Sequence, residues 1–246
     1  MTWNISEFYQ LAQHQLLPNE KSFLLLSLVS IQWKFKMCCY HIEEANRILS
    51  ETFTWPEERQ LAEAVGKVLM WSADTDKGRK FAEASFYSIA HVIAFAQSLH
   101  STADILAQVL YFSLDLNRFF TENQKKPKLY LNTVVARMKK HRVAPKVVTA
   151  ANCFLKSNEF HYLSAYVNTT KHKSLVDSPY VIGLVPGQEK HGLEITSFEY
   201  KLKIYPQKWV TDFIGADFKR LSSMFDATGI ELTDFKRSQQ PPTTSA

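Results

Sequence analysis

The sequence has few of the residues that make tight turns. Among its 246 residues, glycine occurs 7 times and proline 9 times, below their usual shares of about 7% and 5%. Sandwiches, barrels and doubly wound sheets need many tight corners, so this scarcity argues against them and favours long helices. Collagen-like and largely disordered classes are excluded too, because 46% of the residues are hydrophobic and only 22% are charged.

Cysteine and long apolar runs are also scarce. Cys38, Cys39 and Cys153 form neither a metal-binding spacing nor an even set for disulfides, so we expect reduced, buried thiols. The chain does not begin with a basic segment followed by an apolar stretch, so no secretory signal is expected. The longest apolar run, Phe23–Ile31, is shorter than the roughly 20 residues that cross a bilayer. We expect a cytoplasmic protein without membrane contact, in which this run belongs to a core helix.

Most of the chain has helical hydrophobic spacing. Apolar residues recur at helical intervals from Ile5 to about residue 118, and again over about 130–174. A capping-box pattern at Ser101–Asp104 leaves open whether the stretch 81–118 is one helix or two.

A change of period marks a small β insertion. Residues 180–185 and 193–205 predict a hairpin, and the alternation of Phe198, Tyr200 and Leu202 with charged residues predicts a half-buried second strand. Pro206 then opens a final helix with an apolar seam. The predicted fold is an all-α helical bundle with a small antiparallel β-hairpin inserted before the last helix.

One helical domain is expected over residues 1–236. The helices of residues 1–74 either belong to this domain or form a separate extension. Residues 237–246 are polar and have nothing to bury, which predicts a disordered tail.

Positive charge is concentrated in one part of the sequence. Between Lys125 and Lys173 there are eleven lysines and arginines and one acidic residue, whereas the rest has 18 basic and 23 acidic residues. Cations near a helix C-terminus complement its dipole, but this explains only a few of them. A localised excess attracts phosphates because binding releases condensed counterions. The cations that we assign to a nucleic-acid-binding surface are Arg137, Lys139, Lys140, Arg142, Lys171 and Lys173.

One predicted helix places an amide and two histidines on one face. At about 100° per residue, His161, Asn168 and His172 fall within roughly 60° of arc. Lys171 and Lys173 flank His172, and neighbouring cations disfavour its protonated form. This environment suits a general base or a phosphate contact.

A polar stripe crosses the long helix, where His100, Asp104 and Gln108 share a face among apolar neighbours. Buried polar groups need partners, so the stripe is either a satisfied network or the wall of a ligand or catalytic pocket. One histidine and one aspartate are too few for a metal site, and neither a metal nor a cofactor is expected. The histidines without partners by spacing are His14, His41, His91, His141 and His191.

The segment Tyr166–His172 resembles the signature region of the HEPN superfamily of small helical domains, some of them uncharacterised bacterial proteins. Its ribonuclease motif is an arginine, four to six residues and a histidine, often with a polar residue after the arginine. Asn168 matches the polar position and His172 the histidine, while Val167 stands at the arginine position. The resemblance implies metal-independent RNA cleavage at a composite site of a homodimer. Because a lysine does not replace the bidentate arginine, binding is favoured over cleavage.

Three functions remain open from the sequence. The first is a HEPN-like module that binds RNA or a nucleotide through residues 125–173 in bacterial defence or stress. The second is a metal-independent endoribonuclease that uses His172 and Asn168. The third is a protein-interaction or antitoxin-like scaffold with an operon partner and no nucleic-acid role. Convergence of the cations beside His172 would favour the first two functions.

Overall fold

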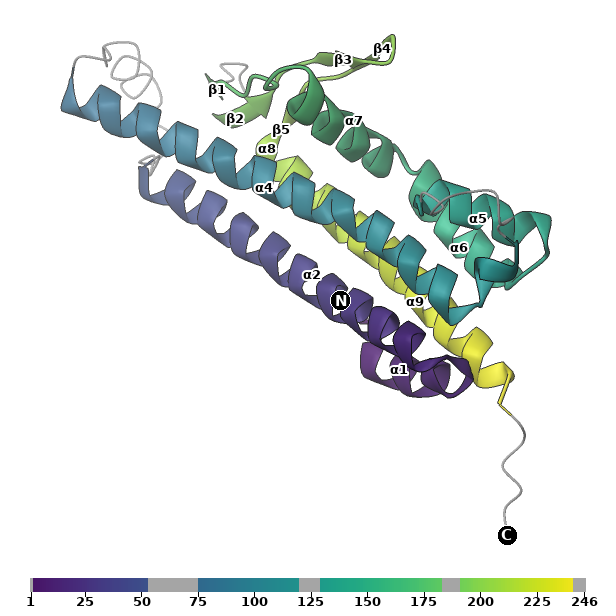
Figure 1. Cartoon of the computed structure of the whole chain (residues 1–246). Coiled ribbons are helices and arrows are strands. Elements are labelled where there is room, and N and C mark those ends of the chain that lie inside the picture. Colours follow the sequence, from purple (N-terminus) through teal and green to yellow (C-terminus); the bar gives the residue numbers. More distant parts are fainter. Residues whose placement is uncertain (1, 53–74, 120–128, 183–190, 241–246) are drawn as a thin grey trace. The chain divides into compact units, whose positions relative to one another are not determined.

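The computed structural model describes residues 2–52, 75–119, 129–182 and 191–240 (Figure 1). The fold is mostly helical, with short antiparallel strands inserted before the last helix, and this confirms the predicted fold class. The chain divides into two compact units. The first unit comprises residues 1–36, 98–162 and 219–246, and the second unit comprises residues 37–97 and 163–218.

Within the described residues the helices agree closely with the predicted stretches, and residues 53–74 of the first stretch lie outside them. In chain order they are α1 (Ile5–Ala12), η1 (Gln13–Gln15), α2 (Pro18–Thr52), α4 (Asp76–Ser113), η3 (Leu116–Phe119), α5 (Leu131–Lys140), α6 (Pro145–Lys156), α7 (Asn158–His172), α8 (Val210–Asp212), the π-helical turn η4 (Phe213–Asp217) and α9 (Phe218–Ser238). The last helix therefore includes Arg237, which pairs with Asp234 at 2.5 Å. The remainder of the predicted tail, residues 241–246, lies outside the described residues.

The long helix α4 is continuous through the predicted capping box. Ser101 Oγ donates to the Ser98 carbonyl at 2.8 Å, and Thr102 Oγ1 donates to the Leu99 carbonyl at 2.7 Å. These hydroxyls bond back to the preceding turn, as serine and threonine do inside helices, and do not cap a new helix. Of the two alternatives at this point, one helix is correct.

The N-terminal segment of the first unit is tied to α9. Trp3 is buried, and its Nε1 donates to Thr233 Oγ1 at 3.0 Å. Its ring centroid lies 6.3 Å from that of Phe225, which belongs to the predicted and buried seam of α9. A Cβ atom on Gly229 would lie 2.2 Å from the Trp3 ring, so only glycine permits this close approach.

The second unit contains the strands. Strand β2 (His191–Ile195) pairs antiparallel with β1 (Tyr180–Ile182) and with β5 (Lys208–Trp209), with Tyr180 opposite Leu193. Phe95 of α4 and Phe213 of η4 form the buried core behind them with Tyr166 of α7, whose ring lies 5.4 Å from Phe213.

The predicted single strand over residues 193–205 is wrong in its second half. The chain forms a separate hairpin of β3 (Phe198–Tyr200) and β4 (Lys203–Tyr205), and it reverses at Lys201 and Leu202. Both turn residues are left-handed, with φ of 51° and 61°. The turn, and not strand alternation, therefore sets the direction of Leu202, which is 95% exposed.

Helix α2 is less buried than a core helix. Over Pro18–Ile48 it is the one helix among the described residues that is long and apolar enough to cross a membrane, and only 33% of its apolar window is buried. The expectation of buried thiols holds for Cys38 and is wrong for Cys39 of α2 and Cys153 of α6, which lie on exposed positions of their helices.

Candidate anion-binding site

The predicted amide–histidine face lies in the second unit. Asn168 is half-buried, and its Nδ2 donates to the Ser164 carbonyl one turn earlier in α7 at 2.7 Å. His172 is exposed at the end of α7. Val167, at the position of the signature arginine, is 1% exposed and therefore lies in the core. The amide is engaged within its own helix, and the arginine position does not reach the surface.

The predicted cations fall in different units. Lys171 and Lys173 belong to the second unit, and Arg137, Lys139, Lys140 and Arg142 belong to the first. Lys139 and Lys140 are exposed on α5, whereas Arg137 is half-buried and its Nη1 donates to the Phe119 carbonyl at 3.1 Å. Convergence of these cations beside His172 stays a prediction.

The polar stripe of α4 has neighbours within the first unit. The His100 ring is stacked on Phe160, with centroids 6.0 Å apart and planes at 2°. Gln108 Oε1 accepts from Ser27 Oγ of α2 at 3.3 Å, and Asp104 is half-buried. These contacts favour the first alternative, in which the stripe is a satisfied network that connects α4 with α2 and α7. Across the described ranges, no group of three His, Cys, Asp or Glu side chains could hold a metal ion.

Three histidines for which the sequence shows no partner nearby have one in the structure, supplied by a distant segment of the chain. In the second unit, Nδ1 of His41 lies 2.9 Å from Nδ1 of His91, and the Tyr40 ring contacts both imidazoles. Burial, and then the charge of His91, lower the pKa of His41. The Tyr180 hydroxyl lies 3.0 Å from His191 Nδ1.

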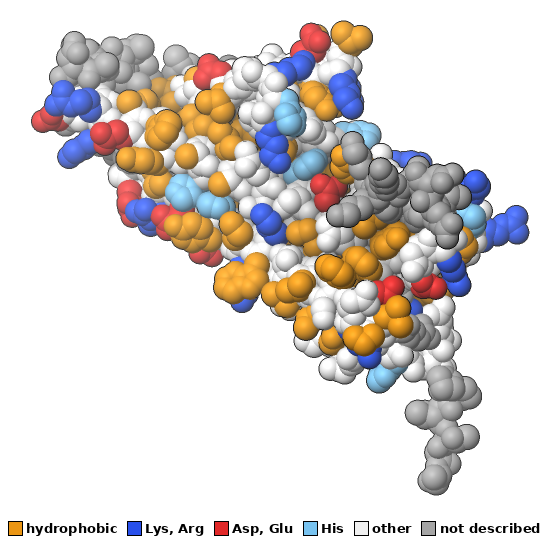
Figure 2. All heavy atoms as spheres, in the orientation of Figure 1, with side chains coloured by type: hydrophobic (Ala, Val, Ile, Leu, Met, Phe, Trp, Pro, Cys, Tyr) orange, Lys and Arg blue, Asp and Glu red, His pale blue; other side chains and the backbone are white. Residues whose placement is uncertain are grey.

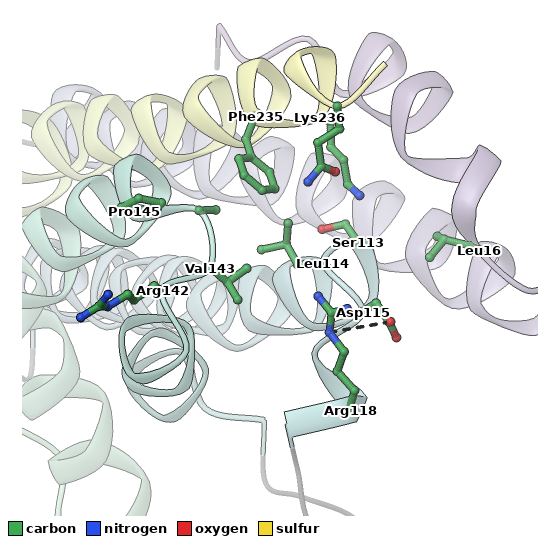
Figure 3. Close-up of a pocket in the computed structure, with 12 residues that line it drawn as sticks. Leu16, Ser113, Leu114, Asp115, Arg118, Arg142, Val143, Pro145, Phe235 and Lys236 are labelled. Atoms are coloured by element: carbon green, nitrogen blue, oxygen red, sulfur yellow. Dashed lines mark ion pairs between the residues drawn. The ribbon is translucent and has the colours of Figure 1, made fainter. Parts of the chain in front are cut away.

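A cavity of about 700 Å³ lies within the first unit. Its walls come from the end of α4, from η3, from the α5–α6 connection and from the C-terminal end of α9 (Figure 3). The lining residues that bear on its chemistry are Ser113, Asp115, Arg118, Arg142, Phe235 and Lys236. This volume is within the range of small-molecule sites, about 300–1,000 Å³.

The backbone around the cavity is strained. Asp115, Arg142 and Ala144 are left-handed, with φ of 49°, 54° and 45°, and all three line the cavity. Left-handed residues other than glycine are uncommon, and each costs roughly 1–2 kcal/mol. Arg142 is the left-handed residue of a Schellman cap that ends α5, because its N–H donates to the Lys139 carbonyl at 3.3 Å and that of Val143 donates to the Met138 carbonyl at 2.9 Å. An arginine in place of the glycine usual at this position keeps the strain at the cavity wall.

Two polar groups of the cavity are removed from water. Lys236 is 4% exposed, and burial lowers its pKa, an effect that the negative charge of Asp115 opposes. Ser113 is 1% exposed, and its Oγ has no hydrogen-bond partner in the part of the chain that the structure describes. In Figure 3 the Lys236 amine points toward Ser113. A buried hydroxyl without a partner is costly unless something bonds to it.

The other charges of the cavity are more exposed. Arg118 Nε lies 4.0 Å from Asp115 Oδ2, and both side chains are 59% exposed, so this ion pair contributes little stability. Figure 3 shows the Arg118 guanidinium rising from η3 into the cavity, while that of Arg142 points away from Asp115. Lys236 and Arg118 thus place two cations in the cavity with the one carboxylate of Asp115, which gives it a net positive charge.

Comparison with protein-family models, with curated proteins and with solved structures finds no match for this chain. Its function is therefore inferred from the geometry of its own residues.

Sequence reasoning identified Arg142 but missed the rest of the cavity. Lys236 had a recognisable signal, because it follows Leu232 by four residues and so falls on the apolar seam of α9. Arg118 and Ser113 carried no such signal, since the other walls of the cavity come from distant segments of the chain.

Proposed function

We propose that the first unit binds a small phosphate-bearing ligand of nucleotide size in this cavity. The observation that carries this proposal is the nearly buried Lys236 beside the unpartnered hydroxyl of Ser113. Removal from water strengthens the hydrogen bonds that a charged group makes to a ligand. A phosphate oxygen would accept from both groups and would neutralise the excess of positive charge.

The shape and lining of the cavity favour a nucleotide over a bare anion. Phosphate alone occupies a small part of about 700 Å³. The apolar side chains of Leu114, Val143 and Phe235 supply the rest of the wall, and an aromatic ring such as Phe235 can stack on a base. Arg118 offers the planar, bidentate geometry that suits phosphate oxygens.

RNA is a second candidate ligand, and the exposed end of α5 favours it. Lys139 and Lys140 are exposed just before Arg142, which lines the cavity. A strand whose terminal phosphate entered the cavity would pass these lysines, and its affinity would depend strongly on salt. Cleavage of RNA is not proposed, because Val167 is buried and the Asn168 amide bonds within its own helix.

Titration calorimetry with adenosine, AMP, ATP and inorganic phosphate tests nucleotide binding. We expect binding of the phosphate-bearing compounds and none of adenosine. Arg118→Gln should weaken ATP binding at least about tenfold, the effect of one charge-assisted hydrogen bond. Lys173→Gln, in the second unit, is the control and should bind ATP like the wild type. If wild-type protein binds none of these compounds at millimolar concentration, the nucleotide proposal is wrong.

A salt series with a short single-stranded RNA tests the second candidate. We expect Lys139→Glu combined with Lys140→Glu to weaken RNA binding and to reduce its salt slope, while ATP binding persists. An RNA affinity that does not change with salt would exclude this candidate.

A further inference from the structure

Helix α2 has two apolar seams on different faces. The inner seam is buried and includes Leu24, Leu28, Ile31 and Phe35. The outer seam consists of Phe23, Leu26, Ser30, Trp33, Met37 and Tyr40, all on this one continuous helix. The inner seam packs α2 within its own chain. In the outer seam the Phe23 ring stacks on Phe112 and the Tyr40 ring contacts His41 and His91, but the large apolar side chains of this seam stay at least 41% exposed.

The spacing of the outer seam is that of a coiled coil. Successive positions are separated alternately by three and four residues from Phe23 to Tyr40. This is the a/d heptad repeat, whose period of 3.5 residues keeps one stripe of a helix in contact with a second helix. The spacing of the outer seam therefore indicates that a second helix covers it.

The outer seam leaves large apolar side chains in water. The exposed fractions are 54% for Phe23, 62% for Leu26, 61% for Trp33, 41% for Met37 and 54% for Tyr40. Figure 2 shows hydrophobic side chains gathered over the helix that Figure 1 labels α2. Apolar stripes of this extent mark interaction sites on soluble proteins.

We propose that the outer seam binds the outer seam of a second copy of this chain, so that the protein forms an antiparallel α2–α2 homodimer. At about 200 Å² for a whole aromatic side chain, the exposed parts amount to on the order of 500 Å² per chain. Two copies would bury about 1,000 Å², the lower limit for a specific interface. The dimer is therefore expected to be reversible.

The order of residues along the seam favours the antiparallel arrangement. Ser30 and Trp33 lie at its centre, with Phe23 and Tyr40 at its ends. In an antiparallel pair the small Ser30 faces Trp33 of the partner subunit, which gives the indole a hole to fill. Phe23 then faces Tyr40 of the partner subunit. A parallel pair would instead place each Trp33 against its own copy.

A lipid surface is the alternative occupant. Leu25 and Val29, next to the seam, are 43% and 39% exposed, and helices that lie in a bilayer interface immerse a broad apolar face. The heptad spacing of the seam itself favours a second helix, and vesicle binding separates the two occupants.

Sedimentation velocity of the full-length protein tests the homodimer. We expect a monomer–dimer equilibrium with a micromolar Kd for the wild type, and at least a 100-fold weaker dimer for Leu26→Glu combined with Trp33→Glu. Trp33→Ser alone adds no charge and should weaken the dimer at least tenfold. The control is Leu202→Glu, which changes an exposed leucine outside the seam and should leave the Kd unchanged. Circular dichroism checks that each variant keeps its helix content.

Some outcomes would overturn the homodimer. A wild type that stays monomeric up to 200 µM contradicts it, as does dimerisation that the seam substitutions do not alter. Seam-dependent binding to phosphatidylserine vesicles by a monomeric wild type would assign the seam to a membrane instead.

Cross-linking tests the antiparallel arrangement. Phe23→Cys and Tyr40→Cys chains, each with Cys39 and Cys153 replaced by serine, should form a mixed disulfide dimer when combined and little when oxidised separately. Disulfides only between identical chains would contradict the antiparallel pairing. The homodimer is independent of the nucleotide proposal, because neither set of variants touches the other surface.

Discussion

The two units of this protein place their positive charges in opposite environments. In the first unit Lys236 is 4% exposed and lines a cavity with Arg118, whereas in the second unit Lys171 and Lys173 are exposed beside His172. An exposed lysine keeps its hydration, while a buried one loses part of it at a considerable cost in free energy. A single buried lysine is therefore better evidence for a binding site than several lysines at the surface.

The strained backbone of the two units has different explanations. In the second unit Lys201 and Leu202 are left-handed because a two-residue hairpin turn requires positive φ at both central residues. In the first unit Asp115, Arg142 and Ala144 are left-handed without forming such a hairpin, and all three line the cavity. Hairpin geometry explains the first case, whereas Arg142 is left-handed because it ends α5 in a Schellman cap that lies in the cavity wall.

The largest expected effect comes from removing the buried charge. Lys236→Met should weaken ATP binding at least about 30-fold, because a hydrogen bond to a charged group contributes about 2 kcal/mol. The same substitution should change the free energy of unfolding by no more than about 1 kcal/mol, since the loss of a desolvated ammonium and the loss of its attraction to Asp115 oppose each other. Calorimetry and urea denaturation measure the two effects.

Lys173→Met is the matched control in the second unit and should change neither quantity. If Lys236→Met lost stability and kept its ATP affinity, Lys236 would have a structural role and the contrast between the units would fail.

Close packing gives the next largest effect. Gly229→Ala should lower the free energy of unfolding by about 2 kcal/mol, because the new Cβ collides with the Trp3 ring. Gly215→Ala, in the second unit, meets no atom within 4 Å and should leave stability unchanged or slightly higher. Guanidinium denaturation monitored by tryptophan fluorescence measures both. Equal losses for the two variants would contradict the close approach of Trp3.

Relieving the strain of the hairpin turn should raise the free energy of unfolding, by less than Gly229→Ala lowers it. Lys201→Asn combined with Leu202→Gly supplies the residues that this turn prefers, and it should raise the free energy of unfolding by about 1 kcal/mol. The melting temperature in scanning calorimetry provides the measurement. Arg142→Gly is the counterpart at the cavity, where relief of strain should come with weaker ATP binding. Stabilisation at Arg142 without any loss of ATP binding would indicate that the cavity strain is unrelated to the ligand.

Lowering the pH should have the smallest effect on the free energy of unfolding, and we expect it from His41 of the second unit. Burial, and then His91, lower the pKa of His41. As the pH falls, His41 is therefore protonated in the unfolded chain before it is protonated in the folded chain. Stability is therefore complete above the ordinary histidine pKa of about 6.5 and falls as the pH drops below it. Urea midpoints at pH 7.5 and pH 5 measure the loss. His91→Gln keeps a polar partner without the charge and should reduce this loss; an unchanged loss would mean that other groups cause it.

The helices were predictable because their signal is local. The apolar seams of α5 and α9, such as Leu221, Phe225 and Leu232, recur at the helical period and are buried as expected. The same rule failed at Leu202, where alternation continues through residues that form a turn. Turn formation there depends on pairing between β3 and β4, which alternation within one strand does not show.

The cavity could be predicted only in part. Arg142 stood out in a basic segment, but Lys236 and Asp115 are far apart in the chain and approach one another only through the packing of α9 with the end of α4. The contact of His41 with His91 is hidden in the same way, since each histidine has unremarkable neighbours in its own helix.

The sequence by itself determined the helical class, the position of the β insertion and the seams of the helices, because these follow from intervals of a few residues. The tertiary structure decided which lysine is buried, which hydroxyl has no partner and which apolar stripe of α2 stays exposed. These properties depend on the faces that distant segments turn toward one another. Desolvation of a charge is a property of that packing, and so the strongest evidence for a function of this protein comes from its fold.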